Sequence, residues 1–570
     1  MLETRFGLGL NFLATWAAWR DDPHRPRLLH YVATEAHPAS AQDLLQAAEN
    51  WPELAPMAQA LAHRWWGLLP GTHRISLDSG QVLLTLGIAD GHEWLAHQHF
   101  LADTLYLSSI DADHSSGMWA PELMSALARR CRPGAPFATS TGAEPVRASL
   151  TAHGFVVETE SRRPIEQDSL HGRFAPPWSA HKPLPQRPQL TSAVVIGGGL
   201  AGAAMAASLA RRGHTVTVLD QAAHPAAGAS GLPAGLFGPH LSTDDAWLSQ
   251  ITRAGMRCTW QTLHDYADLD GSWGATGVLE HRVGRGRHWP HANVEAGRDW
   301  TRPADPDTLR AVGLPPDAPA WWHERAGWIQ PAALVRALLA QPGIQWQGRC
   351  HVSTITRTAS GWHVCDPTGN TLAETDWLIV AAGPATRTLL AGPLAALRPQ
   401  GLPLNEVRGQ MTGQLHAAQT PRLPRFAING HGALIPHVPS AEGPAWYCGA
   451  TFDRSRQTAL LDAADDAANL AKLGELLPEL GGACANSARA EMSRPWSGVR
   501  CTVADRVPLV GPIAPHALPG LWVSTAMGAR GLCLALLCGD IAAAWHGHEP
   551  LPLDDRLARH LAAQRFMHQL

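Results

Sequence analysis

Features that would place this chain in a membrane or an oxidising compartment are scarce. The nine cysteines are scattered without a C-x-x-C pair and no signal peptide follows Met1, which favours a reducing cytoplasm and free thiols. No apolar run reaches the ~18 residues of a membrane span, and the best candidate, residues 533–545, is interrupted by Asp540. We therefore expect a cytoplasmic protein without a membrane segment. We also expect no metal site, and we infer no protein partner.

Charge is also scarce. Charged residues make up 16% of the chain, lysine occurs only at positions 182 and 472, and the formal net charge is −4. No global basic field therefore points to nucleic acid, although a local basic patch is compatible with these totals. The 45% of hydrophobic residues is typical of globular packing, and 570 residues suffice for about three or four domains.

The strongest motif is a glycine-rich turn within residues 193–220. A short apolar strand leads into Gly197, Gly199 and Gly202 as G-x-G-x-x-G, then a helix of small residues, then a second strand ending at Asp220. The glycines permit a tight turn, close approach of a pyrophosphate and helix–strand packing, while the acid takes ribose hydroxyls. This order predicts dinucleotide binding, and an ordinary glycine-rich turn is the weaker alternative.

Later glycine-rich stretches favour FAD as the dinucleotide. The loop 228–235 contains Ser230 and Gly231. The predicted strand 377–384 ends in an Ala-Gly-Pro sequence that contains Gly383. A turn with Gly528, Arg530 and Gly531 precedes the last long helix. An NAD enzyme needs only the first fingerprint, whereas a flavoprotein often closes its cofactor site with a C-terminal segment. Residues 434–437 and 446–451 predict strands of a second sheet, and residues 408–410 predict a short polar turn.

The first part of the chain predicts a separate α/β domain. We place this domain at residues 1–175, a Pro-rich linker at 176–190 and the dinucleotide-binding part at 191–570. A turn with Gly7 and Gly9 follows the first strand, and Glu35 and Asp90 follow later strands. Acids at successive strand ends beside a glycine turn suit a nucleoside at the carboxyl edge of a parallel sheet. Plain helix caps explain such acids equally well.

Longer motifs connect the chain to known families. Residues 190–570 resemble the D-amino-acid-oxidase-like flavoproteins, which include glycine and sarcosine oxidases, in IGGGLAGA, GASG, AAGP, RGQ, GVR and MGARGL. The whole chain resembles the narrower family of bifunctional tRNA methylaminomethyl-thiouridine biosynthesis proteins, in FGLGLNFLATW, WPELAP, Met118-Trp119 and RPG at 132–134. The resemblance implies an α/β fold: a Rossmann-like methyltransferase domain, then a Rossmann-type FAD-binding domain with an interleaved antiparallel-sheet substrate domain.

The resemblance also implies a chemistry. FAD would take hydride from carboxymethylaminomethyl-uridine at the tRNA wobble position, the imine would hydrolyse to glyoxylate and aminomethyl-uridine, and dioxygen would reoxidise the flavin. The first domain would methylate the freed amine with S-adenosylmethionine. Arg500 and Arg530 are expected on turns that match the carboxylate-binding arginines of glycine-oxidase relatives, and the resemblance implies that both bind substrate. The implied FAD residues are Gly197, Gly199, Gly202, Asp220, Ser230, Gly231, Gly383, Gly528 and Gly531, and the implied S-adenosylmethionine residues are Gly7, Gly9, Glu35 and Asp90.

Departures from the family pattern predict that methyl transfer is weak or lost. Arg5 stands in place of the first glycine of the pattern, where its side chain would crowd a nucleoside. Ser108 stands where the family has an aspartate that would meet the methyl-accepting amine, and serine cannot orient an ammonium with charge. We expect a first domain that is also shortened at its N-terminus. Leu232 and Ala234 replace Asn and Gln of some members, which affects fine positioning around FAD.

Two other functions compete with the tRNA-modifying enzyme. The chain could be a small-molecule amine or amino-acid oxidase that carries a relic N-terminal domain. Alternatively, the N-terminal domain could be a non-catalytic module that docks tRNA for the flavin half. Peroxide production from glycine or sarcosine, compared with that from modified tRNA, distinguishes the small-molecule oxidase from the tRNA-modifying enzyme. If the N-terminal domain docks tRNA, deleting residues 1–185 should abolish tRNA binding and leave FAD absorbance intact.

Overall fold

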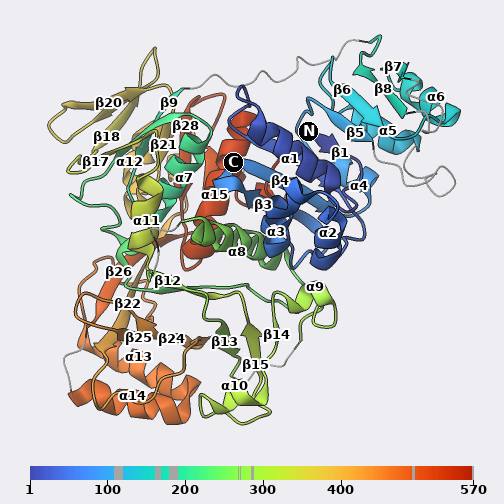
Figure 1. Ribbon diagram of the computed structural model, residues 1–570. Coiled ribbons are helices and arrows are strands. Elements are labelled where there is room, and N and C mark those ends of the chain that lie inside the picture. The colour runs from blue at the N-terminus through green and yellow to red at the C-terminus, as the bar shows by residue number, and fades with distance from the viewer. Residues whose placement is uncertain are drawn as a thin grey trace. The chain divides into compact units, whose positions relative to one another are not determined.

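The chain divides into two compact units. The computed structural model describes residues 1–107, 120–160, 169–178, 191–266, 269, 271–283, 288–490 and 494–567. Residues 1–189 together with 543–558 form the first unit, and residues 190–542 together with 559–570 form the second (Figure 1). Most of the linker predicted at 176–190 lies outside the described residues, as do Ser108 and Met118-Trp119.

One mixed sheet organises the first unit. Its described strands run in the order β3-β4-β2-β1-β5-β6-β8-β7, and β4, β2, β1, β5 and β6 are mutually parallel. The strands are β1 Leu2–Glu3, β2 Leu29–Thr34, β3 Gly71–Leu77, β4 Val82–Ile88, β5 Leu105–Leu107, β6 Pro136–Thr139, β7 Phe155–Glu160 and β8 Ser169–Phe174. The helices are α1 Leu10–Asp21, α2 Ala41–Ala48, α3 Ala55–Arg64, α4 Gly91–Ala96, α5 Pro121–Ala128, α6 Glu144–Ala152 and α16 Asp555–Arg559.

Apolar side chains cover both faces of this sheet. Every residue of β4 is buried, so the strand reads as a continuous apolar run instead of an alternating one. One core cluster contains Phe12, Trp16 and Tyr31, and a separate cluster contains Leu105 and Phe137. Because β2 and β4 are parallel neighbours, Glu35 and Asp90 follow them at the same edge of the sheet.

A second parallel sheet carries the glycine-rich turn in the second unit. Its strand order is β17-β10-β9-β21-β28-β27, with only β27 antiparallel to its neighbour among the described strands. The strands are β9 Ser192–Ile196, β10 Thr215–Leu219, β17 Ile344–Gln347, β21 Leu378–Val380, β27 Leu509–Pro512 and β28 Leu521–Thr525. Helix α7, Leu200–Arg211, is built of small residues and is almost wholly buried, as its position against the sheet requires.

Further strands of the second unit form a large mixed sheet in the order β14-β15-β13-β23-β24-β25-β22-β26. They are β13 Val278–His281, β14 Arg302–Pro303, β15 Ala320–His323, β22 Asn405–Leu415, β23 Ala427–Gly430, β24 Gly432–Val438, β25 Ala445–Gly449 and β26 Trp496–Thr502. Helix α13, Ala463–Leu476, packs on β22, β24 and β25, and α14, Pro478–Ala490, packs on α13 (Figure 1). The strands predicted at 434–437 and 446–451 are therefore neighbours in one sheet, as expected.

Smaller elements complete the second unit. Two small sheets have the orders β11-β16-β12 and β18-β19-β20. Their strands are β11 Gly235–Phe237, β12 Trp273–Gly274, β16 Gly327–Ile329, β18 Thr354–Arg357, β19 Trp362–Cys365 and β20 Thr371–Thr375. The remaining helices are α8 Trp247–Asp265, α9 Glu295–Arg298, α10 Pro306–Arg310, α11 Pro331–Leu339, α12 Thr386–Leu394 and α15 Gly531–Gly547. No helix in the described ranges combines the length and the apolar character needed to cross a bilayer.

The polar turn predicted at 408–410 is wrong, because these residues lie inside β22. Arg408 is fully buried and forms an ion pair with Asp465 of α13, and its Nη2 donates to Gln410 Oε1 at 2.8 Å. The Gln410 Nε2 group donates to Asp466 Oδ1 at 3.0 Å. A strand can therefore bury these polar residues, since the helix behind it supplies their partners.

Candidate functional site

A cavity of about 1650 Å³ lies in the second unit. Its wall is built from the parallel sheet, the glycine-rich loops and the mixed sheet. Most residues predicted for this half lie on that wall: Gly197, Gly199, Asp220, Ser230, Gly383, Arg500, Gly528, Arg530 and Gly531. Gly202 and Gly231 do not line the cavity. Segments more than 300 residues apart in sequence, ending with the turn before α15, thus meet around one space.

The turn after β9 needs glycine at two positions. Gly197 has φ +115°, and a Cβ there would lie 2.4 Å from the Ala381 carbonyl oxygen. A Cβ on Gly202 would lie 1.9 Å from the Gly197 carbonyl oxygen. A side chain at position 197 would clash with the backbone at Ala381, and one at position 202 would push α7 away from the turn, so this close approach of α7 needs both glycines.

Asp220 follows β10 and braces the same turn. Its Oδ2 accepts a hydrogen bond from Gly198 N at 2.7 Å, and its Oδ1 accepts one from Ala222 N at 2.8 Å. Each carboxylate oxygen can accept more than one hydrogen bond. Asp220 can therefore fix the loop and still accept hydroxyl groups of a ribose from the cavity side.

Two serine hydroxyls on the wall fit a dinucleotide phosphate or flavin ligand. The Ser230 Oγ accepts from Leu200 N, at the N-terminus of α7, at 2.9 Å, which leaves its hydroxyl hydrogen to donate. Ser524 on β28 is buried, and its hydroxyl finds no hydrogen-bond partner in the part of the chain that the structure describes. Unpaired buried hydroxyls are costly, so a polar ligand in the cavity would satisfy this one.

Two arginine guanidinium groups enter the same cavity. Arg500 lies within β26 rather than on a turn, and burial lowers the pKa of its guanidinium. No acidic residue within the described ranges pairs with it. Arg530 precedes α15, its Nη1 donates to the Arg506 carbonyl oxygen at 3.5 Å, and burial is the main cause that lowers the pKa of its guanidinium. Arginine keeps its charge under such shifts, so both groups can bind a carboxylate.

Gly409 makes room for one of these guanidinium groups. A Cβ at this position would lie 2.8 Å from Arg500 Nη2 and equally close to the Thr451 carbonyl oxygen. The RGQ motif therefore has two structural roles that sequence inspection did not separate. Arg408 ties β22 to α13, and the following glycine lets the Arg500 side chain lie flat across the strand.

A buried charge cluster on the cavity wall escaped sequence inspection. His323 Nε2 lies 3.0 Å from Glu280 Oε2, and Arg282 Nε lies 2.8 Å from Glu280 Oε1. Burial raises the pKa of Glu280, but the His323 hydrogen bond and the neighbouring positive charges outweigh it and lower the pKa to about 2. Nothing local marks these residues, because Glu280 and His323 are ordinary positions of β13 and β15 and Arg282 follows β13 directly.

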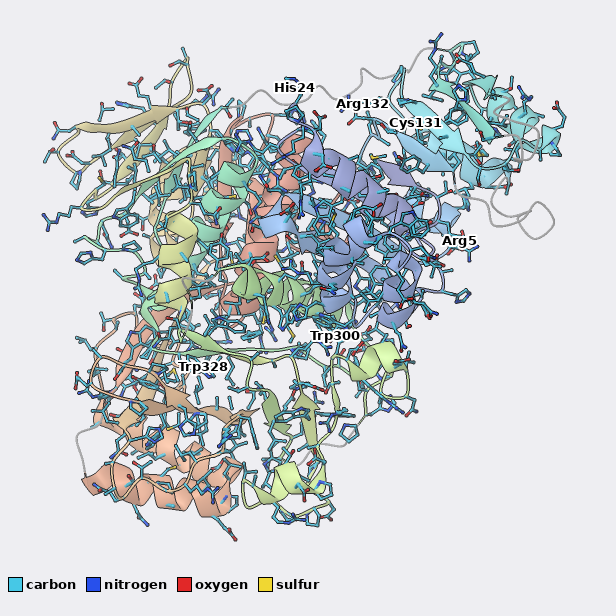
Figure 2. The ribbon with its side chains drawn as sticks, viewed as in Figure 1. Arg5, His24, Cys131, Arg132, Trp300 and Trp328 are labelled. Carbon is cyan, nitrogen blue, oxygen red and sulfur yellow. The ribbon has the colours of Figure 1, made fainter. Side chains whose placement is uncertain are left out.

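His240 also lines the cavity and was not predicted. Burial and then the charge of Arg530 lower the pKa of its imidazole, with smaller opposing and reinforcing contributions from Glu280 and Arg282. Apolar residues share the wall with these charges. Met411 and Ile435 belong to a small core cluster that also contains Trp328, which Figure 2 labels, and Leu236 packs against this cluster.

In the first unit, the predicted nucleoside residues do come together. Gly7 has φ +56° and its N–H donates to Glu35 Oε2 at 3.0 Å, while His37 N donates to Glu35 Oε1 at 3.1 Å. Gly9 has φ +75° and precedes α1. Arg5 Nε lies 3.5 Å from the same Glu35 Oε2 (Figure 2). The arginine that replaces a family glycine thus contacts the acid expected to take the ribose.

Asp90 behaves as a helix cap. Its Oδ1 accepts from His92 N at 3.0 Å and from Glu93 N at 3.2 Å, at the start of α4. The second oxygen of this exposed carboxylate, Oδ2, makes no hydrogen bond within the described residues and is not needed for the cap. Capping and nucleoside binding therefore do not compete for the same oxygen. The predicted contribution of Ser108 lies outside the described residues.

Two family models match the chain. That described as "FAD dependent oxidoreductase" matches residues 192–545, and that described as "S-adenosyl-L-methionine-dependent methyltransferase" matches residues 52–172. The first implies FAD as a cofactor of the second unit, and the second implies S-adenosylmethionine as a cofactor of the first. The glycine turn, Asp220 and the two serine hydroxyls fit the FAD assignment.

Curated relatives extend over nearly the whole chain. The tRNA 5-methylaminomethyl-2-thiouridine biosynthesis bifunctional protein MnmC of Polaromonas naphthalenivorans (strain CJ2) is 45% identical over 99% of this chain and 90% of that protein. The protein of the same name from Acidovorax sp. (strain JS42) is 47% identical over 100% of this chain and 91% of its own.

Solved structures share the fold. Glycine oxidase from Geobacillus kaustophilus superposes with a TM-score of 0.50 at 20% identity, covering 64% of this chain and 97% of its own. L-proline dehydrogenase from P. horikoshii gives a TM-score of 0.52 at 16% identity, covering 66% and 98%. At these identities the likeness carries the fold alone.

Proposed function

The chain belongs to the family of tRNA 5-methylaminomethyl-2-thiouridine biosynthesis bifunctional proteins, and from this we propose that it modifies the wobble uridine of tRNA. Its second unit would oxidatively remove the carboxymethyl group from 5-carboxymethylaminomethyl-(2-thio)uridine to leave 5-aminomethyl-(2-thio)uridine. The observation that carries this proposal is a pair of cavity arginines, Arg500 and Arg530, that have no acidic partner among the described residues and line the same cavity as the glycine-rich turn.

The reaction divides between the cofactor and the chain. When bound, FAD supplies the acceptor for a hydride. The substrate carbon between amine and carboxylate loses that hydride and forms a C=N bond, water adds to it, and the C–N bond breaks to release glyoxylate and the primary amine. Arg500 and Arg530 would bind the carboxylate and so fix which carbon is oxidised.

The same arginines would also prepare the amine. Hydride loss requires a neutral nitrogen, because its lone pair forms the new C=N bond. Positive charges nearby disfavour an ammonium ion and lower the pKa of the bound amine. The apolar wall of Leu236, Met411 and Ile435 limits the water around it, which strengthens these electrostatic effects.

The test is the product formed from tRNA. Purified protein incubated with tRNA carrying 5-carboxymethylaminomethyluridine should yield aminomethyluridine and glyoxylate, read by mass spectrometry of the nucleosides. Peroxide in equal amount would support dioxygen as the reoxidant, which we propose. We also propose a cytoplasmic location, which a tRNA substrate supports. Turnover of glycine or sarcosine without turnover of tRNA would instead favour the small-molecule oxidase, which the relatives' names do not favour.

For the first unit we propose a methyltransferase fold in which methyl transfer is weak or lost. The contact of Arg5 with Glu35 supports this, since the guanidinium competes with ribose hydroxyls for the same carboxylate oxygen. Isothermal titration with S-adenosylmethionine tests binding, and the appearance of methylaminomethyluridine at ordinary turnover would contradict the proposal. If this unit only docks tRNA, the full-length protein should bind tRNA but not S-adenosylmethionine.

A further inference from the structure

A short segment between β25 and α13, residues 450–462, contributes exposed side chains to the cavity wall. Phe452 and Arg454 both line the cavity, and Phe452 is 53% exposed. The Arg454 guanidinium carbon lies 5.8 Å from the centre of the Phe452 ring. Wall residues that are also exposed mark the opening of a cavity, so this pair lies at its mouth.

The backbone of the segment is held firmly. Asp453 exchanges two backbone hydrogen bonds with Arg408 of β22, at 2.8 and 2.9 Å. Arg456 forms ion pairs with Asp453, with Asp462 at 2.7 Å and with Asp465 at 3.2 Å. Phe452 is therefore exposed on a segment whose backbone is fixed, because the next residue, Asp453, is bridged to β22.

Two arginines of this segment differ in their partners. Arg456 is neutralised by three carboxylates, whereas Arg454 pairs with no acidic residue of the described chain and contacts an aromatic ring instead. An arginine over an exposed phenylalanine presents a flat cationic and aromatic surface. Nucleobases stack on aromatic rings and on guanidinium planes, and both surfaces tolerate the negative charge of a nucleotide.

The segment also lies close to the carboxylate-binding arginine. The position of a Cβ on Gly409 is 2.8 Å from both Arg500 Nη2 and the Thr451 carbonyl oxygen, so these two atoms are near neighbours. Phe452 is the next residue after Thr451. In the proposed substrate, a short carboxymethylaminomethyl arm joins the carboxylate to the uracil ring. A carboxylate held by Arg500 would thus place the ring within reach of Phe452.

We propose that Phe452 and Arg454 form a stacking site for the uracil ring of the modified wobble nucleotide. This inference rests on the proposed function, because it takes the substrate to be a nucleotide. The site would recognise the base, while Arg500 and Arg530 recognise the carboxylate. Small amines that carry the carboxymethyl group without a base would meet only the arginines.

The test compares substrates with and without the base. Phe452→Ala is expected to raise KM by on the order of tenfold for 5-carboxymethylaminomethyluridine, as free nucleoside and in tRNA, with kcat unchanged. The same variant should oxidise N-ethylglycine as the parent does and keep its flavin spectrum. Phe452→Trp should keep the parent's KM for the nucleoside. Arg454→Lys should raise that KM, because lysine keeps the charge but lacks the planar guanidinium group.

A matched control comes from the same segment. Leu460 is 73% exposed and does not line the cavity, so Leu460→Ala should leave both substrates unaffected. Equal losses on N-ethylglycine and on the nucleoside, or no loss on either, would overturn the stacking site. A loss on tRNA alone would assign Phe452 to a neighbouring base and overturn the assignment to uracil. Failure of the proposed function is separate, since the unmodified protein would then not oxidise tRNA at all.

Discussion

At the scale of single residues, two arginines of the cavity wall differ from other arginines in their partners. Arg500 and Arg530 reach the cavity from β26 and from the turn before α15, and neither is neutralised by an acid of the described chain. Arg408 and Arg456, in contrast, are paired with aspartates and serve the fold. A carboxylate partner thus separates these two structural arginines from the two that we propose as substrate ligands.

Replacing either ligand-binding arginine should damage catalysis more than folding. We expect Arg500→Lys and Arg530→Lys to lower kcat/KM for the modified tRNA by roughly one hundredfold, because a lysine cannot make the two parallel hydrogen bonds of a guanidinium. Flavin content and melting temperature should stay near those of the parent. Arg310, an exposed arginine paired with Asp307 far from the cavity wall, offers Arg310→Lys as a control. Unchanged kinetics in both cavity variants would contradict their assignment.

Arg5 tests the interpretation of the first unit. Its side chain is 41% exposed, so the contact with Glu35 is weak, yet it occupies the oxygen that also accepts from Gly7 N. Arg5→Gly should raise the affinity for S-adenosylmethionine by roughly two- to fivefold in isothermal titration. Arg20→Gly, which removes the exposed pair with Asp78, should not. A parent protein that already binds S-adenosylmethionine tightly would refute the expected loss.

Glu280 makes stability depend on pH. Its pKa of about 2 in the folded chain lies below the ordinary glutamate value of 4.5, so the unfolded chain takes up a proton first on acidification. The ion pair therefore stabilises the fold above the ordinary value and is lost as pH falls toward about 2. Melting temperatures between about pH 5 and about pH 3 should fall more steeply for the parent than for Glu280→Gln. Parallel curves would contradict the buried pair.

At the scale of elements, the join between β9 and α7 decides whether the cofactor can bind. Gly202→Ala would place a methyl group 1.9 Å from the Gly197 carbonyl oxygen, so the helix must shift outward. We expect the purified variant to carry less than about a tenth of the parent's flavin, read from its visible absorbance. Gly392→Ala is the matched control, since a Cβ there meets nothing within 4 Å and alanine favours helix α12. Full flavin in the Gly202 variant would refute the packing requirement.

At the scale of the whole molecule, a C-terminal segment belongs to the unit built from the N-terminal residues. Within that unit, Arg74 Nη2 donates to the Pro550 carbonyl oxygen at 2.6 Å, and His30 Nε2 lies 3.5 Å from Glu549 Oε2. Leu553 in the same segment is 1% exposed. The first unit therefore needs residues from both ends of the sequence, and the two units do not correspond to two continuous halves of the chain.

Removal of residues 1–185 should expose this segment. We expect the fragment 186–570 to keep flavin absorbance but to aggregate or melt at lower temperature, because residues 543–558 lose their apolar partners. Replacing 543–558 in the fragment by a short Gly/Ser linker should restore its behaviour in gel filtration. A fragment that is monodisperse and as heat-stable as the full chain would contradict this dependence.

The sequence by itself determined the elements whose signals are local. Spacing and residue type were enough to predict the strand–turn–helix at residues 192–211, the acid Asp220, and the unit of β28, glycine turn and helix near the C-terminus. Each glycine and each apolar residue there acts on its near neighbours. The long helix α15 was likewise evident from its small and apolar residues. Family motifs then gave both folds and both cofactors.

Tertiary structure alone decided what long-range partners do. The RGQ motif looks like a turn until α13 supplies aspartates for Arg408 and Gln410, and Glu280 gains its meaning only when β13 pairs with β15. Arg5 could be seen as a departure, but its contact with Glu35 depends on how β1 and β2 align. Local sequence sets backbone preference, whereas burial and charge pairing depend on residues that only the folded chain brings together.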